Sequence, residues 1–274
     1  MNQTTQTLAA AVDGFNAIRP VTRFDVSGFP CQTAACVDDT WLPNNTSEDR
    51  RWALAQVAAI EACEGVWPLI ESVPPRRRGV MVGAESGRAT FTTVLDFARA
   101  AGGGKTFQHE LFGEQARAFA DTFEAAAVSP ATVASRLAAM IGATGASQTM
   151  SLACSSSAAA LVEGVRALRS GELDVVLCGG VGADVDPLML AGFGLLGALS
   201  PSGRSCPFDV RRDGFVVGEG AAMFLLSALP PASLGLRTLA QIIGVGRTLD
   251  AHHLVQPHPQ GDGATRAMRA ALAE

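Results

Sequence analysis

One cysteine lies where the chain could carry out covalent chemistry. Cys154 follows a strand-like stretch, 147–152, and precedes an alanine-rich stretch, 158–168, with strong helical character. The first turn of a helix has unpaired backbone N–H groups and the positive end of the helix dipole. Both favour a thiolate, and the N–H groups can stabilise the oxyanion that forms when sulfur attacks an acyl carbonyl. The position alone fits an acyl-transfer nucleophile and a buried structural cysteine equally well.

Other motifs in the chain carry weaker signals. Gly104-Lys105-Thr106 resembles the end of a phosphate-binding loop, but the first glycine of that motif would fall at Arg99. The two Gly-Val-Gly runs that follow strand-like stretches lack the third glycine of a dinucleotide site. His252, His253 and His258 are more typical of a loop at the edge of a pocket than of a metal site. We therefore predict neither a cofactor nor a bound metal.

The elements that must position Cys154 alternate between strands and helices. Strands are expected at 79–82, 147–152, 174–178, 221–226 and 239–245, and helices at 48–63, 130–141, 158–168, 187–195 and 265–273. The strand at 174–178 is apolar after its first residue, so it should be buried on both faces, and the last two strands should be buried as well. This alternation predicts an α/β protein with parallel strand pairing.

Composition excludes several classes of protein. The 274 residues are 48% hydrophobic and 17% charged, which is enough for a large buried core. The net charge of −5 comes without a basic stripe, so we expect no nucleic-acid partner. The longest apolar stretch, 188–199, is shorter than the ~20 residues of a membrane span, and no signal peptide is visible. Six scattered cysteines are typical of a cytoplasmic protein with reduced thiols.

Several motifs around Cys154 favour the catalytic interpretation. They are Ser151-Leu152-Ala153-Cys154-Ser155-Ser156-Ser157, the run LDVVLCGG at 173–180, Gly192-Phe193-Gly194, Cys206-Pro207-Phe208-Asp209, the run RDGFVVGEGA at 212–221, and Asp250-Ala251-His252-His253. In their order and spacing they resemble the motifs of β-ketoacyl synthases, the condensing enzymes of fatty-acid and polyketide assembly. The resemblance covers most of the chain and is most specific from about residue 129 onward.

The resemblance implies a fold and a set of site residues. The fold would be a thiolase-like layered α/β sandwich, mainly its N-terminal half. Residues 1–230 would form the nucleophile half without its usual first strand, and 237–274 would begin the C-terminal half. Cys154 would accept an acyl group from acyl carrier protein as a thioester, with Ser155 and Phe193 contacting the substrate. A malonyl-carrier thioester would then be decarboxylated, and its carbanion would extend the acyl chain by two carbons.

The resemblance also implies partners. The C-terminal half of the family carries two histidines and a lysine for decarboxylation, and none of the four histidines here occupies those motifs. We therefore expect this chain alone to be deficient in condensation. Three explanations remain open: a separate chain supplies that half, the sequence is a fragment, or the core has been rebuilt. The alternative is a non-catalytic partner of a full ketosynthase, similar to a chain-length factor. We also expect a homodimer or heterodimer through the strand at 147–152 and the helix at 132–141, which presents Val133, Leu137, Met140 and Ile141 along one side.

Overall fold

The computed structural model describes residues 6, 9–10, 12–43, 49–88, 90–102, 106–120, 125–228, 235–236, 238–254 and 256–274. The chain forms two compact units, each assembled from three segments that are separate in the sequence. The first unit consists of Met1–Val57, Ser86–Thr132 and Gly182–Ala221, and the second of Ala58–Glu85, Val133–Val181 and Ala222–Glu274. Most of the stretch 229–237, where the boundary between the two predicted domains falls, lies outside the described residues.

A four-stranded sheet is the framework of the second unit, with strand order β4-β3-β5-β6. The strands are β3 at Arg78–Ala84, β4 at Ser147–Met150, β5 at Val175–Ala183 and β6 at Glu219–Ser227. β3 pairs in parallel with both β4 and β5, so that Val80 lies opposite Ser147 on one side and Leu177 on the other. Every residue of β3 after Arg78 is buried, as expected for a parallel strand with neighbours on both sides.

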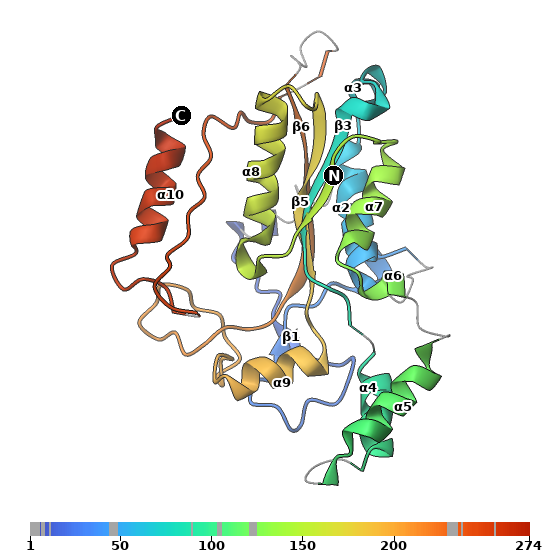
Figure 1. Cartoon of the computed structure of the whole chain (residues 1–274). Coiled ribbons are helices and arrows are strands. Elements are labelled where there is room, and N and C mark those ends of the chain that lie inside the picture. The colour runs from blue at the N-terminus through green and yellow to red at the C-terminus, as the bar shows by residue number, and fades with distance from the viewer. Residues whose placement is uncertain are drawn as a thin grey trace. The chain divides into compact units, whose positions relative to one another are not determined.

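Helices cover both faces of this sheet. α8, Ser156–Arg169, lies on one face, and α3, Trp67–Ser72, lies on the other together with α7, Ala131–Met140, and the end of α2, Arg50–Cys63 (Figure 1). Beyond α8, the C-terminal segment runs beside α10, Asp262–Leu272. The short 3-10 helix η2, Pro75–Arg77, leads into β3. The alternation of strands and helices confirms the predicted α/β class.

The first unit has a small sheet and a separate apolar core. β1, Arg19–Pro20, pairs antiparallel with β2, Thr33–Ala34. Its helices are η1 at Asp39–Trp41, the start of α2, α4 at Phe91–Ala100, α5 at His109–Ala118, α6 at Ala125–Val128 and α9 at Pro187–Leu195. The core comprises Val21, Cys31, Ala34, Val185, Leu190, Leu199 and Val217. α9 has the predicted bounds, because Asp186 accepts hydrogen bonds from the N–H groups of Leu188 and Met189 and Pro187 begins the helix.

The predicted strand at 239–245 is wrong. Residues 238–250 are described and contain no strand. A β carbon on Gly244 would lie 1.8 Å from the carbonyl oxygen of Ala271, so the segment packs its backbone against α10. Leu239 and Ile243 are 87% and 74% exposed. A β pattern needs a neighbouring strand to pair with, and no strand lies beside this segment in the described part of the chain.

Two further expectations about burial are corrected. β6 forms as predicted but lies at the edge of the sheet, so Met223 is buried whereas Phe224 is 53% exposed. Val133 and Leu137 of α7, and Ile141 just after it, are buried in the core of this chain. They are therefore not available for the predicted dimer contact. These side chains pack inward because α7 covers the sheet.

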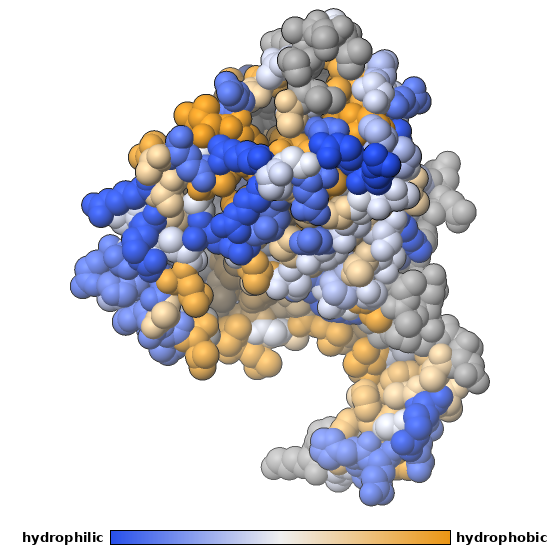
Figure 2. Space-filling model, turned by 45° about the horizontal axis from the view of Figure 1, so that its top comes forward, coloured by the Kyte–Doolittle hydropathy of each residue, from blue (hydrophilic) through white to orange (hydrophobic). Residues whose placement is uncertain are grey.

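The surface carries exposed apolar side chains. Figure 2 shows them, in orange, gathered at several places on the face in view. In the C-terminal segment and α10 they are Leu239, Ile243, Leu249, Leu254, Met268 and Leu272. None of the helices within the described ranges is both long and apolar enough to span a bilayer.

Candidate active site

Cys154 lies in the turn that joins β4 to α8. The turn is a single 3-10 element, Ala153–Ser155, and the cysteine is exposed. The strand-to-helix position predicted from the sequence is confirmed. Ala153 has a φ of 50°, a left-handed conformation that costs a residue with a β carbon about 1–2 kcal/mol. Such a conformation persists only where the surrounding bonds hold it.

Hydrogen bonds hold the backbone on both sides of Cys154. The Ser151 hydroxyl donates to Glu85 Oε2 at 2.8 Å, and the Ala153 N–H donates to Glu85 Oε1 at 3.0 Å. The Ser156 hydroxyl donates to the Ala153 carbonyl at 2.7 Å, accepts the Leu152 N–H at 2.8 Å and lies 3.4 Å from Glu85 Oε1. The left-handed residue is therefore bonded through both its N–H and its carbonyl.

Sequence reasoning missed Glu85. The residue directly follows the buried strand β3, at the carboxyl end of a parallel sheet. This is the edge at which α/β proteins place functional groups. An acidic residue directly after a buried strand could therefore have been identified from the sequence as a candidate site residue.

Two glycines allow α8 to approach the sheet. A β carbon on Gly83 would lie 2.4 Å from the backbone nitrogen of Ser157, and one on Gly180 would lie 2.5 Å from Ser157 Cβ. No side chain fits in either space. The first turn of α8, and with it the Cys154 turn, therefore rests directly on the backbone of β3 and β5.

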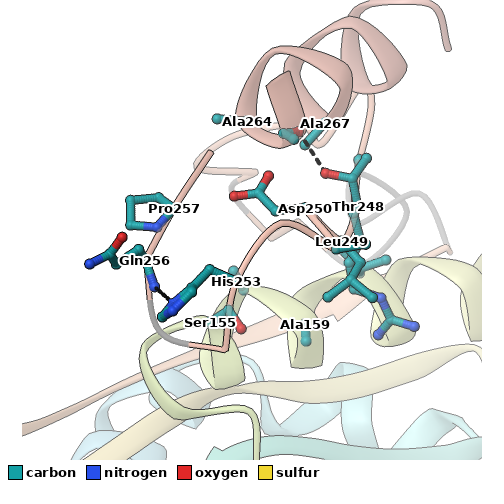
Figure 3. Close-up of a pocket in the computed structure, with 16 residues that line it drawn as sticks. Ser155, Ala159, Thr248, Leu249, Asp250, His253, Gln256, Pro257, Ala264 and Ala267 are labelled. Atoms are coloured by element: carbon teal, nitrogen blue, oxygen red, sulfur yellow. Dashed lines mark hydrogen bonds between the residues drawn. The ribbon is translucent and has the colours of Figure 1, made fainter. Parts of the chain in front are cut away.

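A cavity of about 560 Å³ lies beside the Cys154 turn. α8 lines one side with Ser155 and, further along, with Ala158, Ala159 and Val162. The other side is the loop at 246–257 together with α10. In Figure 3, Ser155 and Ala159 lie on the α8 side, with Thr248, Asp250 and His253 on the other. The small residues after Cys154 leave space, as the sequence indicated.

Ion pairs and hydrogen bonds join the C-terminal segment to α8. Arg247 pairs with Glu163 at 3.0 Å, and Arg169 pairs with Glu274 and donates to the Ile243 carbonyl at 3.1 Å. Exposed pairs of this kind each contribute only about 0–1 kcal/mol. This wall of the cavity is therefore held weakly compared with the sheet and α8.

The histidine cluster lies at the edge of the cavity, as predicted. His253 lines the cavity, and its Nδ1 accepts the Gln256 N–H at 3.1 Å. The His252 and His258 rings are in edge contact, with centroids 5.0 Å apart. The described residues hold no group of three or more histidine, cysteine or acidic side chains that could bind a metal.

Phe193 belongs to the first unit, whereas Cys154 and Ser155 belong to the second. It lies in α9 and packs edge-to-face on Phe215, with ring centroids 5.0 Å apart. The structure thus brings Cys154 and Ser155 together at the start of α8. The predicted contact between Phe193 and the acyl group stays a prediction.

The six thiols differ in exposure. Cys154 and Cys36 are exposed, Cys206 is half-buried, and the other three are buried. Burial raises the pKa of the Cys63 thiol to about 11 and that of Cys178 to about 12. At neutral pH these two thiols remain protonated and inert. Cys154 and Cys36 are the two exposed thiols, and Cys206 is partly accessible.

Comparison with known proteins matches nearly the whole chain. A sequence model of the family described as "Beta-ketoacyl synthase, N-terminal domain" matches residues 8–232. The ketoacyl synthase alpha subunit of the tetracenomycin polyketide synthase of Streptomyces glaucescens is 33% identical over 94% of this chain and 62% of its own length. A 3-oxoacyl-[acyl-carrier-protein] synthase 2 of a Synechocystis strain is 31% identical over 95% of this chain and 62% of its own.

The solved structures agree. The ishigamide ketosynthase/chain length factor superposes with a TM-score of 0.78 at 27% identity, over 98% of this chain and 65% of the other. The predicted thiolase-like fold is confirmed. The chain spans just under two thirds of the length of these relatives.

Proposed function

The chain belongs to the β-ketoacyl synthase family, and on that premise we propose that Cys154 is its acyl-accepting nucleophile. The thiolate sulfur attacks the carbonyl carbon of an acyl group carried as a thioester by acyl carrier protein. The new carbon–sulfur bond forms as the bond to the carrier breaks, and the carrier thiol leaves with a proton. The acyl group is then held on Cys154 as a thioester.

The observation that carries this proposal is the placement of an exposed thiol in a fixed turn. Cys154 is exposed, it directly precedes the first turn of α8, and Ser155 beside it opens onto the cavity. The helix start can stabilise the oxyanion that develops during attack. Cys36 is also exposed, but it lies in the first unit, where its sulfur is 3.5 Å from the Arg23 guanidinium.

Condensation in the family uses two histidines and a lysine, and the four histidines of this sequence do not lie in the expected motifs. Of the four histidines, His109 begins α5, and the other three lie in the loop at the edge of the cavity. We propose that a polypeptide of these 274 residues accepts an acyl group but does not condense it with a malonyl-carrier thioester. The exposed apolar side chains of the C-terminal segment and α10 support the covering of this face by further polypeptide, in the same chain or in another.

The proposed self-association rests on β4. This strand lies at the edge of the sheet, and its first two residues, Ser147 and Gln148, are exposed. An edge strand offers unpaired N–H and C=O groups to a second copy or to a related chain. The proposed location is cytoplasmic, which the six free thiols support.

The test is the transfer of an acyl group from an acyl-carrier thioester, followed by intact-protein mass spectrometry. The unaltered chain should gain one acyl group, and Cys154→Ala should gain none, while the matched variant Cys36→Ala should behave as the unaltered chain. The alternative, a non-catalytic partner similar to a chain-length factor, predicts no adduct on any of the three proteins. Acylation that persists in Cys154→Ala would refute the proposal.

A further inference from the structure

We propose that Glu85 is the positioning residue of the Cys154 turn. The inference rests on the proposed role of Cys154 as nucleophile. Glu85 does not act on the substrate in this proposal. It fixes the backbone on both sides of the cysteine so that the sulfur stays at the start of α8.

The strand register places Glu85 beside the turn. β3 and β4 pair in parallel, with Gly83 opposite Met150. Two residues beyond that pair, the chain from β3 reaches Glu85 and the chain from β4 reaches Leu152. The carboxyl ends of two neighbouring parallel strands therefore bring together groups that are 66–71 residues apart in the sequence.

The carboxylate contacts both arms of the turn. It accepts from the Ser151 hydroxyl at 2.8 Å before the cysteine, and from the Ala153 N–H at 3.0 Å immediately next to it. After the cysteine, the Ser156 hydroxyl lies 3.4 Å away. Hydrogen bonds to an ionised acceptor are about twice as strong as those between neutral groups. Cys154 thus lies between residues that all contact one carboxylate.

The backbone conformation explains why this support matters. Ala153 is left-handed, with a φ of 50°, and relaxation of this residue would turn Cys154 away from its present direction. Glu85 accepts the N–H of that residue, and Ser156 accepts the N–H of Leu152 while donating to the Ala153 carbonyl. Without Glu85, the Ala153 N–H loses the acceptor that holds it in the left-handed conformation.

The opposite end of the same sheet offers a matched control. Arg77 precedes β3, Asp174 precedes β5, and the two form an ion pair. Asp174→Asn also removes a carboxylate that holds two parallel strands together, but far along the strands from the turn. If the effect came from a general loosening of the sheet, both variants should show it. A change in reactivity that is confined to Cys154 should occur only when Glu85 is replaced.

The experiment measures the rate of iodoacetamide labelling at each thiol of the full chain by peptide mass spectrometry. Glu85→Ala should slow the labelling of Cys154 about tenfold relative to Cys36, because iodoacetamide reacts with the thiolate and the sulfur would leave the helix start, whose N–H groups and dipole favour that form. Glu85→Gln keeps an oxygen for the Ala153 N–H, so it should slow labelling only about threefold. Asp174→Asn should leave the ratio unchanged.

Two results would overturn the proposal. One is a Cys154-to-Cys36 ratio in Glu85→Ala within twofold of the unaltered chain. The other is a slower Cys154 accompanied by new labelling of the buried Cys63 and Cys178, which would indicate loss of packing. If Glu85→Ala does not fold, the same labelling is measured for Glu85→Gln and Glu85→Asp. An unchanged Cys154-to-Cys36 labelling ratio in both variants would overturn the proposal. Labelling does not require acyl transfer, so failure of the acylation assay would refute the proposed function separately.

Discussion

Replacing Gly83 by alanine is expected to displace the first turn of α8 from the sheet. The added β carbon would lie 2.4 Å from the backbone nitrogen of Ser157, and 2.5 and 2.7 Å from further backbone atoms of Ser156 and Ser157. Ordinary contact begins near 3.4 Å, so the helix start must move by about 1 Å. Backbone atoms cannot rotate aside as the end of a flexible side chain can, and the helix therefore moves as a whole.

The expected magnitude follows from this overlap. Overpacking of a tight site costs about 1–3 kcal/mol, which corresponds to a fall in the unfolding midpoint of roughly 2–12 °C for a chain of this size. The Cys154 turn moves with the helix, so acyl transfer to Cys154 should fall about tenfold or more. The measurements are a thermal denaturation curve and the acylation assay on the same preparation.

The matched control is Gly113→Ala. Gly113 lies in α5, and a β carbon there would meet no atom within 4 Å. Alanine should therefore stabilise the helix by about 0.5–1 kcal/mol. If Gly83→Ala matched Gly113→Ala in both midpoint and acylation rate, the argument from close approach would be refuted.

Three other predictions follow from burial and from strand order. The free energy of unfolding should fall as the pH rises above about 9, because the unfolded chain ionises thiols that burial keeps protonated in the folded state. In the folded state the pKa is about 11 for Cys63 and about 12 for Cys178. Cys178→Ala should weaken this pH dependence in urea titrations, and an unchanged slope of unfolding free energy against pH would contradict the prediction. The Glu219 side chain is fully buried and pairs with Arg50 and Arg23. Glu219→Ala should lower the free energy of unfolding by about 3 kcal/mol, because it leaves the two arginines without this partner. A decrease below about 1 kcal/mol in the same titrations would show that the pairs contribute little. Light scattering should show a dimer that Gln148→Lys at the exposed edge of β4 weakens, and a monomeric unaltered chain would exclude the contact.

Local sequence signals predicted the elements whose determinants are local. α9 was predicted to the residue because Asp186 and Pro187 specify its start. The Cys154 turn was predicted because an alternating strand pattern changes there to an alanine-rich helix pattern. In both cases the information lies within a few residues of the element.

The features that sequence analysis missed depend on distant parts of the chain. The pattern at 239–245 favours a strand, but strand formation needs a partner, and this segment packs on α10 instead. Glu85 gains its significance only when the register of β3 and β4 brings it to the turn. The apolar side of α7 was assigned to a dimer contact because a periodicity identifies a buried face without identifying what buries it.

The interleaving of the two units has a consequence for how the protein is made. Six consecutive segments alternate between the units, and the last segment of the first unit ends at Ala221 while that of the second ends at Glu274. Synthesis from the N-terminus usually lets one domain finish folding before the next emerges. Here the chain up to residue 221 must leave the ribosome before the first unit has all its parts, and the chain up to residue 274 before the second unit has. Nascent chains should therefore expose unfinished sheet and helix faces for longer than a protein with domains arranged in series, and depend more on chaperones.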